Sequence, residues 1–198
     1  MLPEETTKGM VLGEQEIVAR AKEDPAAFGA LYEAYVDKIY SYVYHRVGNH
    51  HDAEDLTSRT FYKALSNLQR YTDRGLPFSA WLYRIAHNLV ANFHRDRSRR
   101  EVLCLDGLVI VGPQDEAPEV MIERAEDGDA LREAIRRLPS ERQELLILKH
   151  NEGLPNAEIG SIMGRSEGAI KSLYYRTLLA LKRDLTKKRG SNCENEVP

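Results

Sequence analysis

Aromatic and basic side chains occur together in one stretch near the middle of the chain. Tyr71 and Arg74 lie in a turn-rich segment that precedes Trp81 and Arg84. Aromatic rings can stack on unpaired bases while neighbouring cations hold phosphates, and single-stranded nucleic acid requires both. Asn88 follows Trp81 by seven residues, so about two helical turns place both on one face. An amide there suits the edge of an unpaired base.

The same residues also have a purely structural interpretation. A large aromatic residue such as Trp81 often serves as a buried anchor, and a run of arginines often forms only a solvated face. Five arginines follow Trp81 against a single acid, Asp96: Arg84, Arg95, Arg97, Arg99 and Arg100. Their proximity to stacking aromatics favours nucleic-acid binding for the arginines, whereas both interpretations of Trp81 stay open.

A second basic segment has the pattern of a helix-turn-helix. A short helix is expected over Asn156–Met163, Gly164 turns the chain, and Ser166 caps a longer helix that runs to about Leu185. Such a pair can place its second helix in the major groove of duplex DNA. Small residues at the start of that helix permit close approach, and polar side chains follow on the next turns: Gly168, Ala169, Lys171, Ser172, Tyr175 and Arg176.

Catalytic and metal-binding patterns do not occur in the sequence. The six histidines form no His-Glu-x-x-His arrangement, and Cys104 and Cys193 lack metal-ligand spacing. There is no glycine-rich phosphate loop and no Gly-x-Ser-x-Gly. We therefore expect a protein that is not an enzyme and that needs no cofactor or metal.

The elements that must position these residues are all helical. Apolar residues recur at helical spacing along most of the chain, and no segment has the alternating period of a strand. Ser140-Glu141-Arg142-Gln143 has the pattern of a capping box. Helices are expected over 14–23, from Asp24-Pro25 to Val47, over 52–68, from Phe78 onward, over 119–138, from Ser140 to Gly153, and in the helix-turn-helix. This predicts an all-α fold.

Charge divides the chain more clearly than composition does. The net charge is only −3, but Glu101–Asp129 holds nine acids against Arg124, and Arg165–Arg189 holds eight bases against two acids. Segregation of this size indicates a polyanionic partner for the basic parts. We therefore expect a helical domain over residues 1–100, an acidic linker over 101–128, a helix-turn-helix domain over 129–185 and a disordered tail over 186–198, with residues 1–13 frayed.

Two features bear on surroundings. No apolar run approaches the roughly 20 residues of a membrane span, and the N-terminal residues lack the pattern of a signal peptide. Two isolated cysteines fit a reduced compartment, so a cytoplasmic protein without membrane insertion is expected. Within the linker, the apolar patch Leu103–Val111 fits either a short strand or a segment that docks into a partner.

Two motif sets resemble a known family. Asp52-Ala53-Glu54-Asp55-Leu56 before an aromatic residue, and Trp81-Leu82-Tyr83-Arg84-Ile85-Ala86-His87-Asn88, are similar to region two of bacterial sigma factors of the extracytoplasmic-function (ECF) group. Downstream, Glu158-Ile159 and the run from Met163 to Ser172 are similar to sigma region four. The resemblance covers residues 25–100 and 130–185, which is most of the chain.

The resemblance implies three sets of site residues. A pocket for unpaired bases of the −10 element would use Arg70, Tyr71, Thr72, Arg74, Trp81, Arg84, Asn88 and Arg95. Recognition of the duplex −35 element would use Arg165, Ser166, Gly168, Ala169, Lys171, Ser172, Tyr175 and Arg176. Core RNA polymerase would contact Asp52, Asp55, Leu56, Thr60 and Phe61, although Leu56 and Phe61 also fit a plain core role.

The implied partners are core RNA polymerase, promoter DNA in duplex and melted form, and an anti-sigma factor. The implied function is promoter recognition and DNA melting at the start of transcription. A rival hypothesis is a stand-alone helix-turn-helix regulator with an N-terminal interaction domain. That rival predicts sequence-specific binding to duplex DNA without polymerase, so the two can be separated by experiment.

Overall fold

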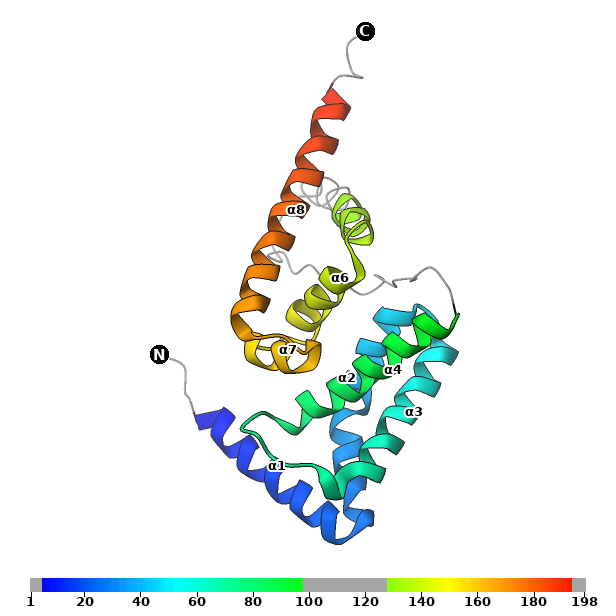
Figure 1. Cartoon of the computed structure of the whole chain (residues 1–198), viewed down its shortest axis with the longest axis vertical. Helices are drawn as coiled ribbons and strands as arrows, with labels where there is room; N and C mark the ends of the chain where they lie inside the picture. Colours follow the sequence, from blue (N-terminus) through cyan, green and yellow to red (C-terminus); the bar gives the residue numbers. More distant parts are fainter. Residues whose placement is uncertain (1–4, 98–127, 194–198) are drawn as a thin grey trace, which may run out of the picture.

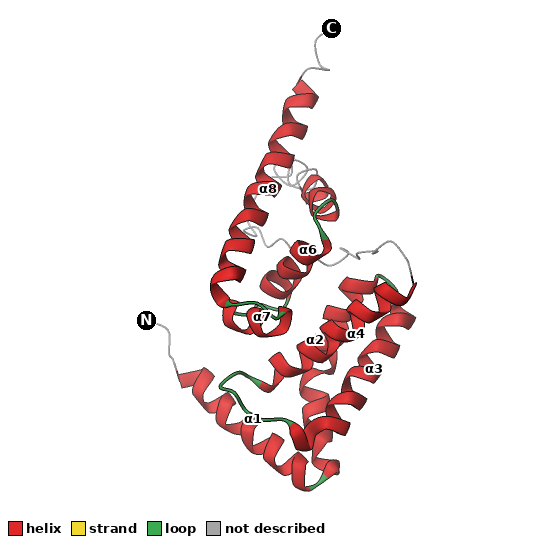
Figure 2. Ribbon diagram, viewed as in Figure 1, coloured by secondary structure: helices red, strands yellow, loops and turns green. Residues whose placement is uncertain are grey.

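The computed structural model describes residues 5–97 and 128–193, and every regular element in these ranges is a helix (Figures 1 and 2). The all-α prediction is confirmed. The expected linker over 101–128 and its apolar patch lie outside the described residues, apart from residue 128, which begins a helix that runs to 136.

The N-terminal half is a bundle of four helices: α1 (Glu5–Glu23), α2 (Phe28–Val47), α3 (His50–Asn67) and α4 (Phe78–Arg97). A 3-10 turn, Pro25–Ala27, precedes α2, and the Asp24 carboxylate caps it by accepting from Ala26 N at 2.9 Å. Gly48, with φ of 68°, ends α2, and the Asn49 side chain caps α3. The apolar faces of α2, α3 and α4 meet in one core.

The C-terminal half begins with helix 128–136 and continues through α6 (Ser140–Leu146), a π-helical segment (Ile147–Asn151), α7 (Asn156–Met163) and α8 (Glu167–Cys193). The predicted bounds of the short helix are confirmed, as is the Ser166 cap, whose hydroxyl accepts from Ala169 N at 3.2 Å. Gly164 turns the chain with φ of 67°.

Three local predictions need correction. The helix α1 starts at Glu5 rather than Glu14, and α8 continues to Cys193 rather than ending near Leu185 in a disordered tail. Charged residues such as lysine and arginine are good helix formers, so polarity alone did not end α8. The capping box at Ser140 does not form, because Pro139 is the cap residue and Ser140 lies inside α6.

The side chains of that supposed capping box serve tertiary contacts instead. Gln143 is buried and donates to the carbonyls of Ile135 (2.9 Å) and Arg136 (3.0 Å), which closes the end of helix 128–136. The Ser140 hydroxyl accepts from Arg46 Nη1 of α2 at 3.2 Å. A contact between distant segments therefore replaced the local cap.

The two halves pack directly on each other. Leu145 and Leu148 join the same core cluster as the helices of the bundle, and so do Ile159 and Ile162 of α7. In Figure 1, α7 lies beside α4, and α8 extends away from the bundle. The sequence predicted two helical domains but gave no sign of this contact.

Glu144 of α6 is the charged centre of that contact. Its carboxylate is 3% exposed and accepts hydrogen bonds from the Tyr42 hydroxyl (2.5 Å) and from His87 Nδ1 (2.6 Å), with Arg46 Nη2 at 3.8 Å. Burial alone would raise its pKa, but the His87 hydrogen bond and the Arg46 charge outweigh burial, so the pKa of Glu144 lies below its usual range.

A second glutamate at the interface has the opposite tendency. Glu152 accepts from the Tyr83 hydroxyl at 2.6 Å and from Ser41 Oγ at 3.4 Å. Burial raises its pKa, since no full charge lies close enough to offset desolvation completely. In the folded protein the ionised form of Glu144 is therefore favoured relative to a free carboxyl, whereas the ionised form of Glu152 is disfavoured.

We predict that Glu144→Gln lowers the free energy of unfolding at pH 7 by about 3 kcal/mol, because it leaves the buried Arg46 without its anion. Since the folded pKa of Glu144 is depressed, its stabilisation is complete above the unfolded pKa of about 4.3 and is lost as pH falls through the folded value. Urea unfolding at several pH values measures both effects.

Glu152→Gln is the matched control at the same interface. Its raised folded pKa means that the carboxylate opposes folding as pH rises through that pKa, so a neutral amide should leave stability at pH 7 unchanged or slightly higher. Equal destabilisation by both variants would contradict the assignment of opposite charge preferences.

A second prediction concerns the helix-turn-helix turn. A Cβ on Gly160 would lie 2.7 Å from the Arg165 carbonyl oxygen, and Arg165 N already donates to the Gly160 carbonyl at 2.8 Å across the turn. Gly160→Ala should therefore lower stability by about 1–3 kcal/mol through overpacking. Gly168→Ala, whose Cβ meets nothing within 4 Å, should be neutral or stabilising in a thermal melt, and the reverse order would refute the packing argument.

Candidate nucleic-acid interface

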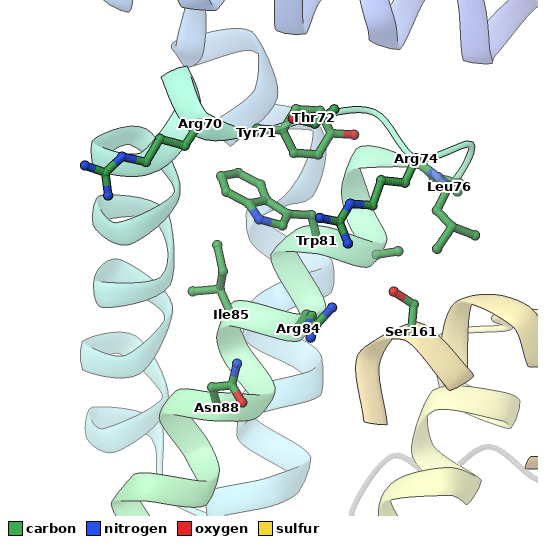
Figure 3. A pocket seen from close by; sticks show the side chains of 12 residues that line it. Arg70, Tyr71, Thr72, Arg74, Leu76, Trp81, Arg84, Ile85, Asn88 and Ser161 are labelled. Atoms are coloured by element: carbon green, nitrogen blue, oxygen red, sulfur yellow. The ribbon is translucent and has the colours of Figure 1, made fainter. Parts of the chain in front are cut away.

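A cavity of about 380 Å³ opens between the loop after α3 and the outer face of α4 (Figure 3). It collects seven of the eight residues predicted for unpaired bases: Arg70, Tyr71, Thr72, Arg74, Trp81, Arg84 and Asn88. The remaining lining comes from residues outside that predicted set: Leu76, Pro77, Ala80, Ile85 and Ser161. One loop and the helix that follows it, with Ser161 of α7, thus enclose a space with apolar walls and a cationic rim.

The position of Trp81 is compatible with both roles that the sequence left open. It is half-buried and packs on Tyr71 (ring centroids 4.9 Å apart) and Phe78 (5.3 Å), so it anchors the loop to α4. It also lines the cavity, where Figure 3 shows its indole between Tyr71 and Ile85. An aromatic fixed on one side and open on the other is suited to stacking a base.

The loop that carries Tyr71 has a defined shape. The Asp73 carboxylate accepts from Gly75 N at 2.7 Å, and Gly75 takes a positive φ of 75°, which a side chain would disfavour. Burial, with Asp73 and Glu14 nearby, raises the pKa of Tyr71 to about 12, so its hydroxyl is neutral near pH 7. The loop therefore presents a neutral aromatic ring between two arginines.

The cavity continues over α3 as a shallower groove. Lys63 and Asn67 line this extension together with Arg70, Trp81, Ile85 and Asn88. Neither Lys63 nor Asn67 was predicted, because both lie beyond the residues of α3 that the sequence motifs include, which end at Phe61. An added lysine and amide give the groove a path for a backbone of phosphates.

Arg95 lies apart from the other predicted residues. It lines a separate crevice between the halves, together with His87, His94 and Arg165. That placement follows from helical geometry, since Arg95 is seven residues beyond Asn88 and about 10 Å further along α4. Arg95 and Arg165, which the sequence assigned to different DNA elements, therefore share one crevice in this arrangement.

The residues predicted for duplex DNA lie together at the start of α8 and in the turn before it. Arg165, Ser166, Gly168, Lys171, Ser172 and Arg176 are exposed, Ala169 is half-buried, and Tyr175 is 64% exposed. Lys171 pairs with Glu167 at 2.7 Å, and Arg165 pairs with Glu141. Leu173, on the opposite side of α8, packs into the core. This surface is basic, continuous and accessible.

Three of the five residues predicted to contact polymerase lie in the core. Leu56, Thr60 and Phe61 are buried, and the Thr60 hydroxyl donates to the Leu56 carbonyl at 2.7 Å. Their helical phase turns them toward α2, where Phe61 contacts Tyr32 at 4.8 Å between ring centroids. Leu56 and Phe61 therefore pack in the core, as one of their two interpretations expected, and Thr60 is buried with them, whereas their contact with polymerase stays a prediction.

The accessible side of α3 has a different composition. Asp55 is exposed, Asp52 is half-buried, and Arg59 pairs with Asp55 at 3.5 Å. Tyr62 is 72% exposed and Leu65 is 40% exposed, and both follow Asp55 on the same side of the helix. Exposed Tyr62 could have been noticed in the sequence, because it falls outside the apolar stripe of α3.

Within 5–97 and 128–193 no group of His, Cys, Asp or Glu is arranged to hold a metal ion. No helix in the described part of the chain is long and apolar enough to cross a membrane.

Family models and curated relatives match most of the chain. Residues 31–100 match sigma-70 region 2, and residues 128–181 match sigma-70 region 4. The ECF RNA polymerase sigma factor BldN of Streptomyces coelicolor is 42% identical over 170 residues, which are 85% of this chain but only 64% of that protein. The ECF RNA polymerase sigma factor SigW of Bacillus subtilis is 31% identical over 172 residues, 83% of this chain and 91% of SigW.

Solved structures share the fold. CnrH in complex with the cytosolic domain of CnrY has a TM-score of 0.58 at 22% identity, covering 88% of this chain and 97% of that one. The sigma factor RpoE from Bartonella quintana, in complex with the anti-sigma factor NepR, has a TM-score of 0.58 at 21% identity, covering 80% and 96%. With both region models matched in order and a close-length relative above 30% identity, the chain belongs to the sigma-70 family, within the ECF group of RNA polymerase sigma factors.

Proposed function

We propose that this protein is a cytoplasmic, non-enzymatic sigma factor. In this proposal it binds core RNA polymerase, recognises the −10 and −35 promoter elements and promotes DNA melting. The observation that carries the proposal is the cavity in which Trp81, Asn88 and the arginine-bearing loop meet, in the segment that matches region 2. Family membership also implies an anti-sigma factor as regulator. The rival, a stand-alone regulator, is not favoured by the matched regions.

In the cavity, contacts with the protein would replace the contacts that the base loses when it leaves the duplex. An unpaired base loses its neighbours in the duplex at a cost of a few kcal/mol. Stacking on Trp81 would return about 1–3 kcal/mol per base, and the exposed Asn88 amide can both donate to and accept from a base edge. Arg70, Arg74 and Arg84 lie at the rim, where they would hold the flanking phosphates.

The surface of α8 would read the upstream element as duplex. The helix begins at Glu167 directly after the capped turn, so its first turns can enter a major groove. Arg176 is the side chain best suited to a bidentate contact with guanine. Lys171 and Arg165 would contact phosphates and would position the helix without reading sequence.

Core polymerase would dock on the accessible side of α3. This face presents the Asp55–Arg59 pair beside Tyr62 and Leu65. An exposed aromatic residue beside an apolar residue and a charge pair has the composition of an interface anchor with a polar rim. The face lies away from the cavity-lining side of α4, so polymerase binding and base capture should be separable by mutation.

The two DNA surfaces are too close in this arrangement to serve one promoter together. Elements named −10 and −35 are centred about 25 base pairs apart, which is roughly 85 Å of duplex. Here Arg95 and Arg165 line one crevice, and Ser161 of α7 lines the base cavity itself. We propose that the described form is closed, and that the halves separate on polymerase.

Transcription in vitro tests the function directly. Core polymerase supplemented with this protein should initiate from a promoter fragment selected for the purpose, whereas core polymerase alone should not. Sequence-specific duplex binding by the protein alone, with no initiation when polymerase is added, would support the rival regulator instead.

For the cavity, we predict that Trp81→Ala and Asn88→Ala each weaken holoenzyme binding to a single-stranded −10 oligonucleotide about tenfold or more, through lost stacking or a lost base-edge contact. Permanganate reactivity of the −10 thymines should fall in parallel, and a pre-melted bubble should partly restore initiation. Asn92→Ala is the matched control, because Asn92 is an exposed residue of α4 that does not line the cavity.

The two mutants should retain normal polymerase binding. Thymine reactivity equal to that of the unmodified protein in both mutants would remove the cavity from the melting step. Loss of polymerase binding would show that the cavity is the polymerase surface.

For the polymerase face, Tyr62→Ala should weaken binding to core polymerase by about 1–2 kcal/mol, the usual effect of removing an aromatic anchor. Tyr175→Ala removes a comparably exposed tyrosine from α8, and it should impair −35 duplex binding while leaving the polymerase affinity near normal. Competition binding to labelled core polymerase measures the first effect. Equal polymerase affinities for the two variants would count against this face.

A further inference from the structure

The N-terminal helix α1 lies against the back of the loop whose front lines the base cavity. Figure 2 shows this loop running beside α1 before it enters α4. A second cavity, of about 360 Å³, separates them in part and is lined by α1 residues and by the loop. Tyr71, Leu76 and Pro77 line both cavities. The loop is therefore a thin wall between α1 and the site.

Three polar contacts tie this wall to α1. The Lys22 ammonium donates to the Tyr71 carbonyl at 2.7 Å and also lies 5.7 Å from the centroid of the Tyr71 ring. The side-chain amide of Gln69 donates a hydrogen bond to the Lys22 carbonyl. Gln15 Nε2 donates to Asp73 Oδ2 at 2.8 Å, and the other oxygen of that carboxylate shapes the turn at Gly75.

These contacts act on the residue that holds Trp81 in place. Tyr71 packs on Trp81 at 4.9 Å and on Phe78 at 5.2 Å, so its backbone position sets where the indole can lie. Residues 72–75 are exposed, which leaves the loop little packing of its own. Donors supplied by α1 replace that packing and fix the loop before a base arrives, which reduces the ordering cost of binding.

We infer that Lys22 and Gln15 are positioning residues for capture of the unpaired base, and that α1 is therefore part of the −10 recognition apparatus. The inference rests on the proposed function of the cavity. Neither side chain lines the base cavity, so both act through the loop rather than on DNA. The sequence motifs of α3 and α4 do not include Lys22 or Gln15 and therefore give no indication of this role.

The test uses Lys22→Met, which keeps the apolar stem and removes the donor, with Lys22→Arg as the conservative variant. Arg20→Met is the matched control, since Arg20 is an exposed cation in the same last turn of α1. Trp81 is the only tryptophan of the chain, so its emission reports the loop directly. Lys22→Met should shift that emission and weaken holoenzyme binding to the single-stranded −10 oligonucleotide about tenfold. Lys22→Arg should restore most of both, and Arg20→Met should change neither.

Gln15→Leu, at an exposed site, provides a second variant if Lys22→Met fails to fold. It should weaken oligonucleotide binding several-fold with a smaller emission change. Unchanged emission and affinity in these variants, while Trp81→Ala still abolishes binding, would overturn the role of α1 and leave the cavity assignment standing. If Trp81→Ala and Asn88→Ala also bind normally, the proposed function of the cavity fails first.

Discussion

The buried carboxylate of Glu144 is the constraint on which the arrangement of the two halves depends. It comes from α6, yet its hydrogen-bond donors Tyr42 and His87 come from α2 and α4. A charge that is 3% exposed must be compensated by its neighbours. The observed placement of α6 on the bundle provides these donors together with Arg46, so the carboxylate favours the register in which the halves pack.

That register determines what surrounds the DNA-binding surfaces. With α6 fixed, the π-helical segment places Glu152 under Tyr83, and α7 packs along α4. Ser161 then borders the cavity that holds Trp81 and Asn88. One side of α7, the helix that precedes α8, is thus covered by α4. The buried Arg46–Glu144 pair therefore helps to determine how accessible the base cavity and the start of α8 are.

Local structure in this protein was largely predictable, whereas contacts between distant segments were not. Helical spacing and the Gly164 turn gave the bounds of α7 correctly, because those signals act within a few residues. Leu56, Thr60 and Phe61 point inward because α2 packs on that side of α3. The sequence of α3 also has large apolar residues on its exposed side, Tyr62 and Leu65, so it does not show which side is buried. The Ser140 pattern failed because α6 begins one residue earlier than the pattern indicates, with Pro139 as its cap residue, and the Ser140 hydroxyl inside the helix contacts Arg46 of α2.

The cavity shows the same division. Seven of the eight residues predicted along the loop and α4 line one cavity, because one helix and its preceding loop suffice to position them, whereas Arg95 lies further along α4 in a separate crevice. Lys63, from α3, and Ser161, from α7, had no signal within their own segments. The contacts of α1 with the loop are equally non-local, which is why Lys22 and Gln15 attract attention only in three dimensions.

The chemistry of the interface also bears on the proposed separation of the halves. Its polar members are incompletely satisfied: Arg46 approaches Glu144 only to 3.8 Å, and among the described residues Arg46 Nε is buried without a hydrogen-bond partner. On separation these charges regain water, which recovers much of the desolvation cost of the pair. What opening must overcome is mainly the exposure of apolar residues such as Leu148 and Ile162, at about 25 cal/mol per Å². An entirely apolar interface of the same extent would regain no hydration free energy from charged groups on separation. The buried glutamates therefore make the contact specific and lower the free energy needed to separate the halves.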